Sequence, residues 1–129
     1  MSQQKNLFGQ VLVALVTPMN AEGEVDWAAT EKHIDYVISN GADGVVVTGT
    51  TGETSTLTDA EKIKLVEVGK SVSAGRAKII TGGGSNETAH AIDLYKKSEK
   101  LGADGIMIVT PYYNKPTQAG VLTHFRLIA

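Results

Sequence analysis

The chain has 129 residues, 42% of them hydrophobic, and a formal net charge of -2 with a pI near 5.9. This length suits one compact domain, and the lack of a basic field argues against nucleic acid or an anionic membrane as partner, so we expect small-molecule substrates. The absence of cysteine excludes disulfides, thiolate metal sites and a cysteine nucleophile. Residues 1–10 lack the apolar core of a signal peptide, and no apolar run approaches the roughly 18 residues of a membrane span, so we expect a soluble, cytoplasmic protein.

Four apolar runs, each closed by a threonine, predict four β-strands at residues 11–17, 45–48, 79–81 and 106–110. The threonines recur at intervals of about 30 residues, which is the length of one strand, one crossover helix and two short loops. The runs are continuous rather than alternating, as in strands that are covered on both faces. Helical patterns in the gaps predict helices over residues 26–40, 58–75, 85–101 and 117–129, the second opened by the capping-box pair Thr58 and Glu61.

Four such βα units predict an α/β fold with a parallel sheet, and they amount to half of a (β/α)8 TIM barrel of about 250 residues. An open four-stranded sheet of the flavodoxin type is the alternative. The apolar residues 127–129 carry no helix-ending signal, so we expect residues 1–129 to be the N-terminal half of a single barrel domain. In either architecture an edge strand would need a partner.

In both architectures ligands gather where the strands end, so we expect Thr17 and the segments 48–53, 81–85 and 110–114 to share one pocket. The densest segment is Gly49-Thr50-Thr51-Gly52-Glu53, which offers two hydroxyls and backbone amides that glycines leave approachable. A carboxylate or phosphate would fit there. The alternative is that these residues simply form a tight turn. The preceding Gly-Ala-Asp-Gly at residues 41–44 returns at residues 102–105, before the strand that leads to the two tyrosines.

Tyr112 and Tyr113 follow the fourth strand, so we expect at least one phenol to face solvent and to exchange protons with a hydroxyl such as that of Thr50. Packing as aromatic surface at a barrel rim or subunit contact is the alternative. Lys115 is a poor candidate nucleophile because a lysine in a solvated loop stays protonated. His33, His90 and His124 lie on separate predicted helices, so we expect surface or packing roles for them and no metal site.

Three segments together resemble the dihydrodipicolinate synthase family of pyruvate-dependent lyases and aldolases. They are Leu-Val-Thr-Pro-Met at residues 15–19, Gly-Thr-Thr-Gly-Glu at residues 49–53 and Thr-Pro-Tyr-Tyr-Asn-Lys-Pro at residues 110–116. The resemblance implies a (β/α)8 barrel in which a lysine forms a Schiff base with pyruvate. The resulting enamine would attack aspartate semialdehyde to give 4-hydroxy-tetrahydrodipicolinate for lysine biosynthesis, with no metal or organic cofactor.

The resemblance also implies roles for individual residues. Thr51, with Thr50, would hold the pyruvate carboxylate, and Thr50 would relay protons. Tyr113 would complete the relay from the neighbouring subunit of a tight dimer, the family forming homotetramers as dimers of dimers. The family's Schiff-base lysine, a further relay tyrosine and a substrate-binding arginine belong to later barrel strands and have no counterpart in this chain, so we expect the chain alone to be inactive.

Regulation and two competing functions stay open. The family's lysine-regulated members carry histidines where this chain has Asp59 and Lys62, and a glutamate where it has His90, so we expect a lysine-insensitive type. One alternative is another aldolase of the same group, such as a sialate lyase or a sugar-acid aldolase. The other is a non-catalytic half-barrel that assembles with a second copy of itself.

Overall fold

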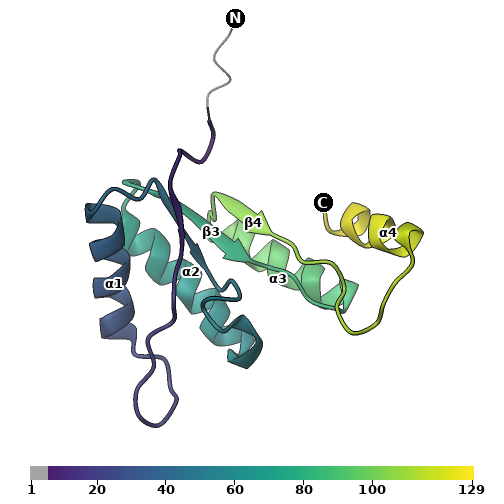
Figure 1. Ribbon diagram of the computed structural model, residues 1–129, viewed down its shortest axis with the longest axis horizontal. Helices are drawn as coiled ribbons and strands as arrows, with labels where there is room; N and C mark the ends of the chain where they lie inside the picture. The colour runs from purple at the N-terminus through teal and green to yellow at the C-terminus, as the bar shows by residue number, and fades with distance from the viewer. Residues whose placement is uncertain (1–5) are drawn as a thin grey trace, which may run out of the picture.

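The computed structural model describes residues 6–129, which alternate between parallel β-strands and α-helices (Figure 1). The predicted lack of a signal sequence concerns residues 1–10, of which residues 1–5 lie outside the described part. The elements are β1 (Leu12–Ala14), α1 (Trp27–Ser39), β2 (Gly44–Val47), the 3-10 helix η1 (Thr54–Thr56), α2 (Asp59–Ser73), β3 (Lys78–Gly82), α3 (Thr88–Lys100), β4 (Gly105–Met107) and α4 (Gln118–Ile128). The predicted α/β class is confirmed, although β1 and β4 are shorter than expected because each has a strand neighbour on one side only.

The sheet is parallel and follows the chain, in the order β1-β2-β3-β4. Val13 of β1 pairs with Val45 of β2, which pairs with Ile79 of β3, so one row of branched side chains crosses three strands. A sequential order without reversal is that of a barrel segment, whereas a flavodoxin-type sheet reverses its strand order at a switch point. The strand order of the described residues therefore excludes the flavodoxin-type alternative.

Side-chain hydrogen bonds mark the starts of the first two helices. Asp26 caps α1 by accepting a hydrogen bond from the Ala29 amide, and Thr58 and Glu61 form the predicted capping box of α2. The third helix starts at Thr88, later than predicted, because residues 85–87 form a turn before it. Among residues 6–129, no helix combines the length and the apolar character needed to cross a bilayer.

Helices α1, α2 and α3 lie on one side of the sheet, and α4 lies beyond α3 (Figure 1). The core fills the space between this side and the helices, with Ile34, Val45, Val66 and Ile79 at its centre and no more than 1% exposed. Five apolar side chains of the strands and their ends remain at least 43% exposed: Val11, Leu12, Val16, Met107 and Val109. The core thus lies between the sheet and the helices, and the ends of the strands lie outside it, where polar groups can be positioned.

Candidate functional site

The carboxyl ends of β2 and β3 are joined by a buried hydroxyl network. Thr48 Oγ1 lies 2.9 Å from Thr81 Oγ1, accepts a hydrogen bond from the Gly82 amide at 3.0 Å, and lies 3.2 Å from the Gly82 carbonyl oxygen. Thr48 has a left-handed backbone, with a φ of 56°, which turns the chain sharply after β2. A Cβ on Gly82 would lie 2.2 Å from the Thr48 carbonyl oxygen, so only glycine permits this approach. The network fixes the start of the following turn.

The turn at residues 49–53 is anchored at both ends. The Gly52 amide donates to the Gly49 carbonyl at 3.1 Å and the Glu53 amide to the Thr50 carbonyl at 3.0 Å. The Thr17 hydroxyl, which follows β1, donates to the Gly52 carbonyl at 2.8 Å in a buried contact. The turn is therefore held by two neighbouring strands.

Thr50 and Thr51 stand at the exposed tip of this turn. Within residues 6–129, neither their hydroxyls nor their backbone amides make a hydrogen bond to another residue. A rigid turn that presents unpaired hydroxyl and amide donors suits a small anion such as a carboxylate, because its donors need no rearrangement on binding. The structure thus brings together Thr17, the segment 48–53 and Thr81, as the sequence predicted.

The tyrosine segment is open to solvent. Tyr112 is 54% exposed and Tyr113 is 93% exposed, and Tyr113 has a left-handed backbone with a φ of 69°. The Asn114 side-chain amide donates to the Asn86 carbonyl at 3.1 Å, which ties the segment to the loop after β3. In the described part of the chain no hydrogen bond joins either phenol to Thr50, so the expected exchange between them is not made within one chain. The prediction that at least one phenol faces solvent is confirmed.

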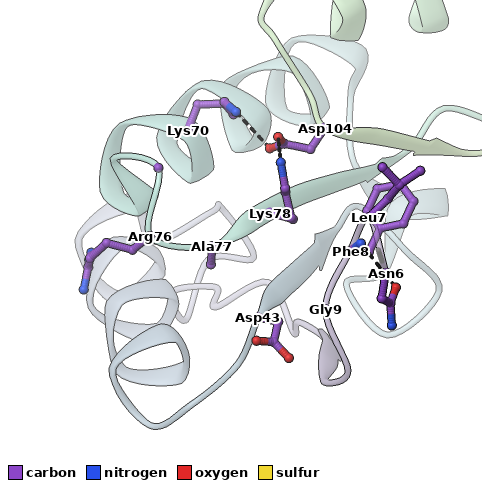
Figure 2. Close-up of a pocket in the computed structure, with 11 residues that line it drawn as sticks. Asn6, Leu7, Phe8, Gly9, Asp43, Lys70, Arg76, Ala77, Lys78 and Asp104 are labelled. Carbon is purple, nitrogen blue, oxygen red and sulfur yellow. Dashed lines mark hydrogen bonds and ion pairs between the residues drawn. The ribbon is translucent and has the colours of Figure 1, made fainter. Parts of the chain in front are cut away.

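A hollow lies at the opposite, amino end of the sheet, where the sequence had indicated no site (Figure 2). It has a volume of about 300 Å³, and Lys70, Lys78 and Asp104 are among its polar lining residues. Lys70 Nζ and Lys78 Nζ lie 2.9 and 3.0 Å from the Asp104 carboxylate, and Figure 2 draws both contacts. Arg76 points away from the hollow and pairs with Asp35 of α1 at 2.6 Å. Lys70, Lys78 and Arg76 are each paired with an aspartate. They are therefore not free to bind an anion, and the volume of the hollow alone does not indicate an anion site.

The repeated Gly-Ala-Asp-Gly segments explain this amino end. The Asp43 carboxylate accepts hydrogen bonds from the Gln10 and Val11 amides at 2.7 and 2.9 Å, and Asp104 accepts one from the Ile79 amide at 3.0 Å. Each aspartate therefore ties the start of the preceding strand to the start of its own. Burial opposes ionisation of Asp104, but its bonds with the Ile79 amide and the two lysines outweigh this and lower its pKa to about 2. The repeated sequence indicated that the two aspartates occupy equivalent positions before their strands. It did not predict the hydrogen bonds that they form.

The histidines do not gather. His124 is buried, with Nδ1 2.9 Å from the Thr88 hydroxyl, which confirms a packing role, while His90 lies between Ser85 and Asp59. In the part of the chain that the structure describes, no group of three or more histidine, aspartate or glutamate residues is placed to hold a metal ion.

The chain is similar in sequence to known proteins. The sequence profile described as the Dihydrodipicolinate synthetase family matches residues 7–129. The chain is 52% identical over 122 residues to the 4-hydroxy-tetrahydrodipicolinate synthase of Synechococcus sp. strain JA-2-3B'a(2-13), covering 95% of this chain and 40% of that protein.

Solved structures agree. A synthase of this family from Cyanidioschyzon merolae with lysine bound superposes with a TM-score of 0.94 at 50% identity, over 97% of this chain and 43% of that one. The chloride-inhibited synthase of Acinetobacter baumannii in complex with pyruvate gives a TM-score of 0.90 at 45% identity, over 92% and 40%. The chain thus has the fold of the first four βα units of these TIM barrels, and it spans about two fifths of the length of the curated relatives that it matches.

Proposed function

Because the chain belongs to the Dihydrodipicolinate synthetase family, we propose that it supplies the pyruvate-binding half of a Schiff-base lyase. The complete barrel would condense pyruvate with aspartate semialdehyde to give 4-hydroxy-tetrahydrodipicolinate in lysine biosynthesis. The observation that carries this proposal is the rigid turn at residues 49–53, whose two threonines present free donors at the carboxyl end of the sheet. In TIM barrels this end holds the active site.

Thr51 and Thr50 would bind the pyruvate carboxylate. Their hydroxyls can donate to its oxygens, while Thr17 and Thr48 keep the turn in place from beneath through buried hydrogen bonds. Thr50 would also pass protons on and off the carbinolamine and the imine, since a hydroxyl both accepts and donates. Positioned acid-base groups typically accelerate such steps by about 10² to 10⁴.

Tyr113 would complete the proton relay from a neighbouring subunit, within a homotetramer built as a dimer of dimers in the cytoplasm. The 93% exposure of Tyr113 supports a role outside its own chain, and its left-handed backbone supports a functional constraint, because such strain gathers at functional sites. The Schiff-base lysine would come from a later strand of the barrel. Lys115 remains a poor candidate for this role because it lies in an exposed loop.

Lysine regulation is expected to be absent. His90 Nε2 and Asp59 Oδ2 lie 2.8 Å apart, and Lys62 Nζ lies 3.4 Å from Asp59 Oδ1, so these charged groups are paired with one another rather than with a lysine ligand. A lysine titration of the completed enzyme should leave its activity unchanged, and inhibition by lysine would contradict this expectation.

The proposed function is tested with a chimera that joins residues 1–129 to the remaining segment of the Synechococcus relative at the aligned position. The chimera should consume pyruvate only when aspartate semialdehyde is present. Turnover with a sugar-acid aldehyde or with N-acetylmannosamine instead would favour another aldolase of the group. A folded chimera with no activity toward any of these aldehydes would contradict the proposal and leave the non-catalytic half-barrel.

A further inference from the structure

A serine, a histidine and an aspartate form one hydrogen-bonded chain that the proposed lyase does not use. His90 Nδ1 lies 3.1 Å from Ser85 Oγ, and His90 Nε2 lies 2.8 Å from Asp59 Oδ2. Ser85 comes from the loop after β3, His90 from the first turn of α3, and Asp59 from the first position of α2. Three separate segments thus converge on one imidazole.

The carboxylate fixes the tautomer of the imidazole. Burial raises the pKa of Asp59, but the hydrogen bond and charge of His90 and the charge of Lys62 outweigh this and lower it, so the carboxylate is ionised at neutral pH and can only accept. Nε2 of neutral His90 must then carry the hydrogen, which leaves Nδ1 as the acceptor. Ser85 is the donor that Nδ1 meets, which is the arrangement in which a histidine acts as a general base toward a serine.

We propose that Ser85 is a nucleophile that His90 activates and Asp59 orients, and that this site hydrolyses small acyl esters. Ser85 Oγ would attack the ester carbonyl as its proton passes to His90 Nδ1. Collapse of the tetrahedral intermediate would expel the alkoxide, which takes the proton from His90 and leaves as the alcohol. Water, deprotonated by the same nitrogen, would then release the acid and restore Ser85.

The surroundings define the size of the substrate and the source of oxyanion stabilisation. Ser85 is 6% exposed, whereas the side chains of His90 and Asp59 are 32% and 42% exposed, so solvent reaches the imidazole more readily than the hydroxyl, and we expect only small acyl groups to react. The Glu87 amide donates to Ser85 Oγ at 3.2 Å, which favours negative charge on that oxygen. Glu87 makes no side-chain cap to α3, so we expect the uncapped first-turn amides of this helix, which begins three residues after Ser85, to stabilise the oxyanion.

The experiment treats the 129-residue chain with p-nitrophenyl acetate and follows acetylation of each serine by peptide mass mapping. Ser85 should acetylate about 10²-fold faster than the exposed Ser71, as expected for general-base assistance, and faster than Ser85 of the same chain in urea. Acetylation of Ser85 no faster than that of Ser71, or no faster in the native chain than in urea, would overturn the proposal.

Two variants separate a nucleophile from a serine that only caps the loop. His90→Gln keeps a hydrogen-bonding side chain but removes the base, and Asp59→Asn removes the charge that sets the tautomer. Both should reduce Ser85 acetylation toward the Ser71 rate, while Ser71→Ala should leave the Ser85 rate unchanged. An unaltered Ser85 rate in His90→Gln would overturn the role of the histidine and the proposal with it.

Discussion

The two ends of the sheet differ in how their polar groups are satisfied. At the amino end a hollow of about 300 Å³ is lined by lysines and aspartates that bind one another and the strand amides. At the carboxyl end the supporting threonines are buried and bonded, while Thr50 and Thr51 keep free donors. The difference suggests a general lesson: unpaired donors on a rigid turn, rather than the volume of a hollow, led us to propose the carboxyl end as the site. Substitutions at the two ends should therefore separate activity from stability.

The largest expected effect is on activity at the carboxyl end. Thr51→Val in the chimera should lower kcat/KM by about 10², because one hydrogen bond to the charged pyruvate carboxylate is lost. The unfolding midpoint in urea should stay close to that of the parent, since the Thr51 hydroxyl is unpaired in the structure. Thr51→Ser keeps the hydroxyl and should retain most of the activity. An active Thr51→Val chimera would remove this threonine from the site.

The next effect is on stability beneath the same turn. Thr48→Val keeps the shape of the side chain but leaves the Gly82 amide and the Thr81 hydroxyl without their partner. We expect a loss of about 3 kcal/mol in the free energy of unfolding, the upper end for buried groups left unpaired. Urea denaturation measures it, with Thr123→Val on α4 as the exposed control. A loss equal to that of the control would show that the network does not hold the turn.

A substitution at the amino end of the sheet should change the free energy of unfolding but not the activity. The pKa of Asp104, lowered from 3.8 to about 2, corresponds to about 2 kcal/mol in favour of the folded state. Because the folded-state pKa lies below the unfolded one, this stabilisation is present above pH 3.8 and is lost as the pH falls toward 2. Asp104→Asn should therefore unfold more easily at neutral pH and converge with the parent near pH 2. It should leave kcat/KM of the folded chimera nearly unchanged, and a large loss of kcat/KM would break the comparison.

The smallest effect should come from the other copy of the repeat. Asp43→Asn removes the charged acceptor of the Gln10 and Val11 amides, but this carboxylate is exposed and forms no ion pair with a lysine within residues 6–129. Its pKa is lowered by those two backbone hydrogen bonds alone, against a weak opposing effect of burial. The urea midpoint should thus fall by less than in Asp104→Asn. An equal or larger fall would mean that the strand-tying bonds, rather than the lysines, stabilise this end.

Sequence patterns predicted the parallel order of the strands, the capping box of α2 and the gathering of Thr17, Thr48 and Thr81, because each depends on local chemistry or on strand periodicity. The late start of α3 and the positive φ of Thr48 were not predicted, since they depend on how the loop after β3 meets the turn after β2. The Asp59–His90–Ser85 chain was missed for the same reason. Asp59 lies 31 residues from His90 in sequence, and only the packing of α2 against α3 brings it to the neighbouring Ser85 and His90.

The most direct measurement is trapping of pyruvate by borohydride, followed by peptide mass mapping, on the folded 129-residue chain, the chimera and its Thr51→Val variant. The account predicts no adduct on the 129-residue chain, one reduced pyruvate on a lysine of the added segment in the chimera, and much slower trapping in Thr51→Val. An adduct on a lysine within residues 1–129, with Lys115 the first to examine, or trapping that does not depend on Thr51, would contradict it.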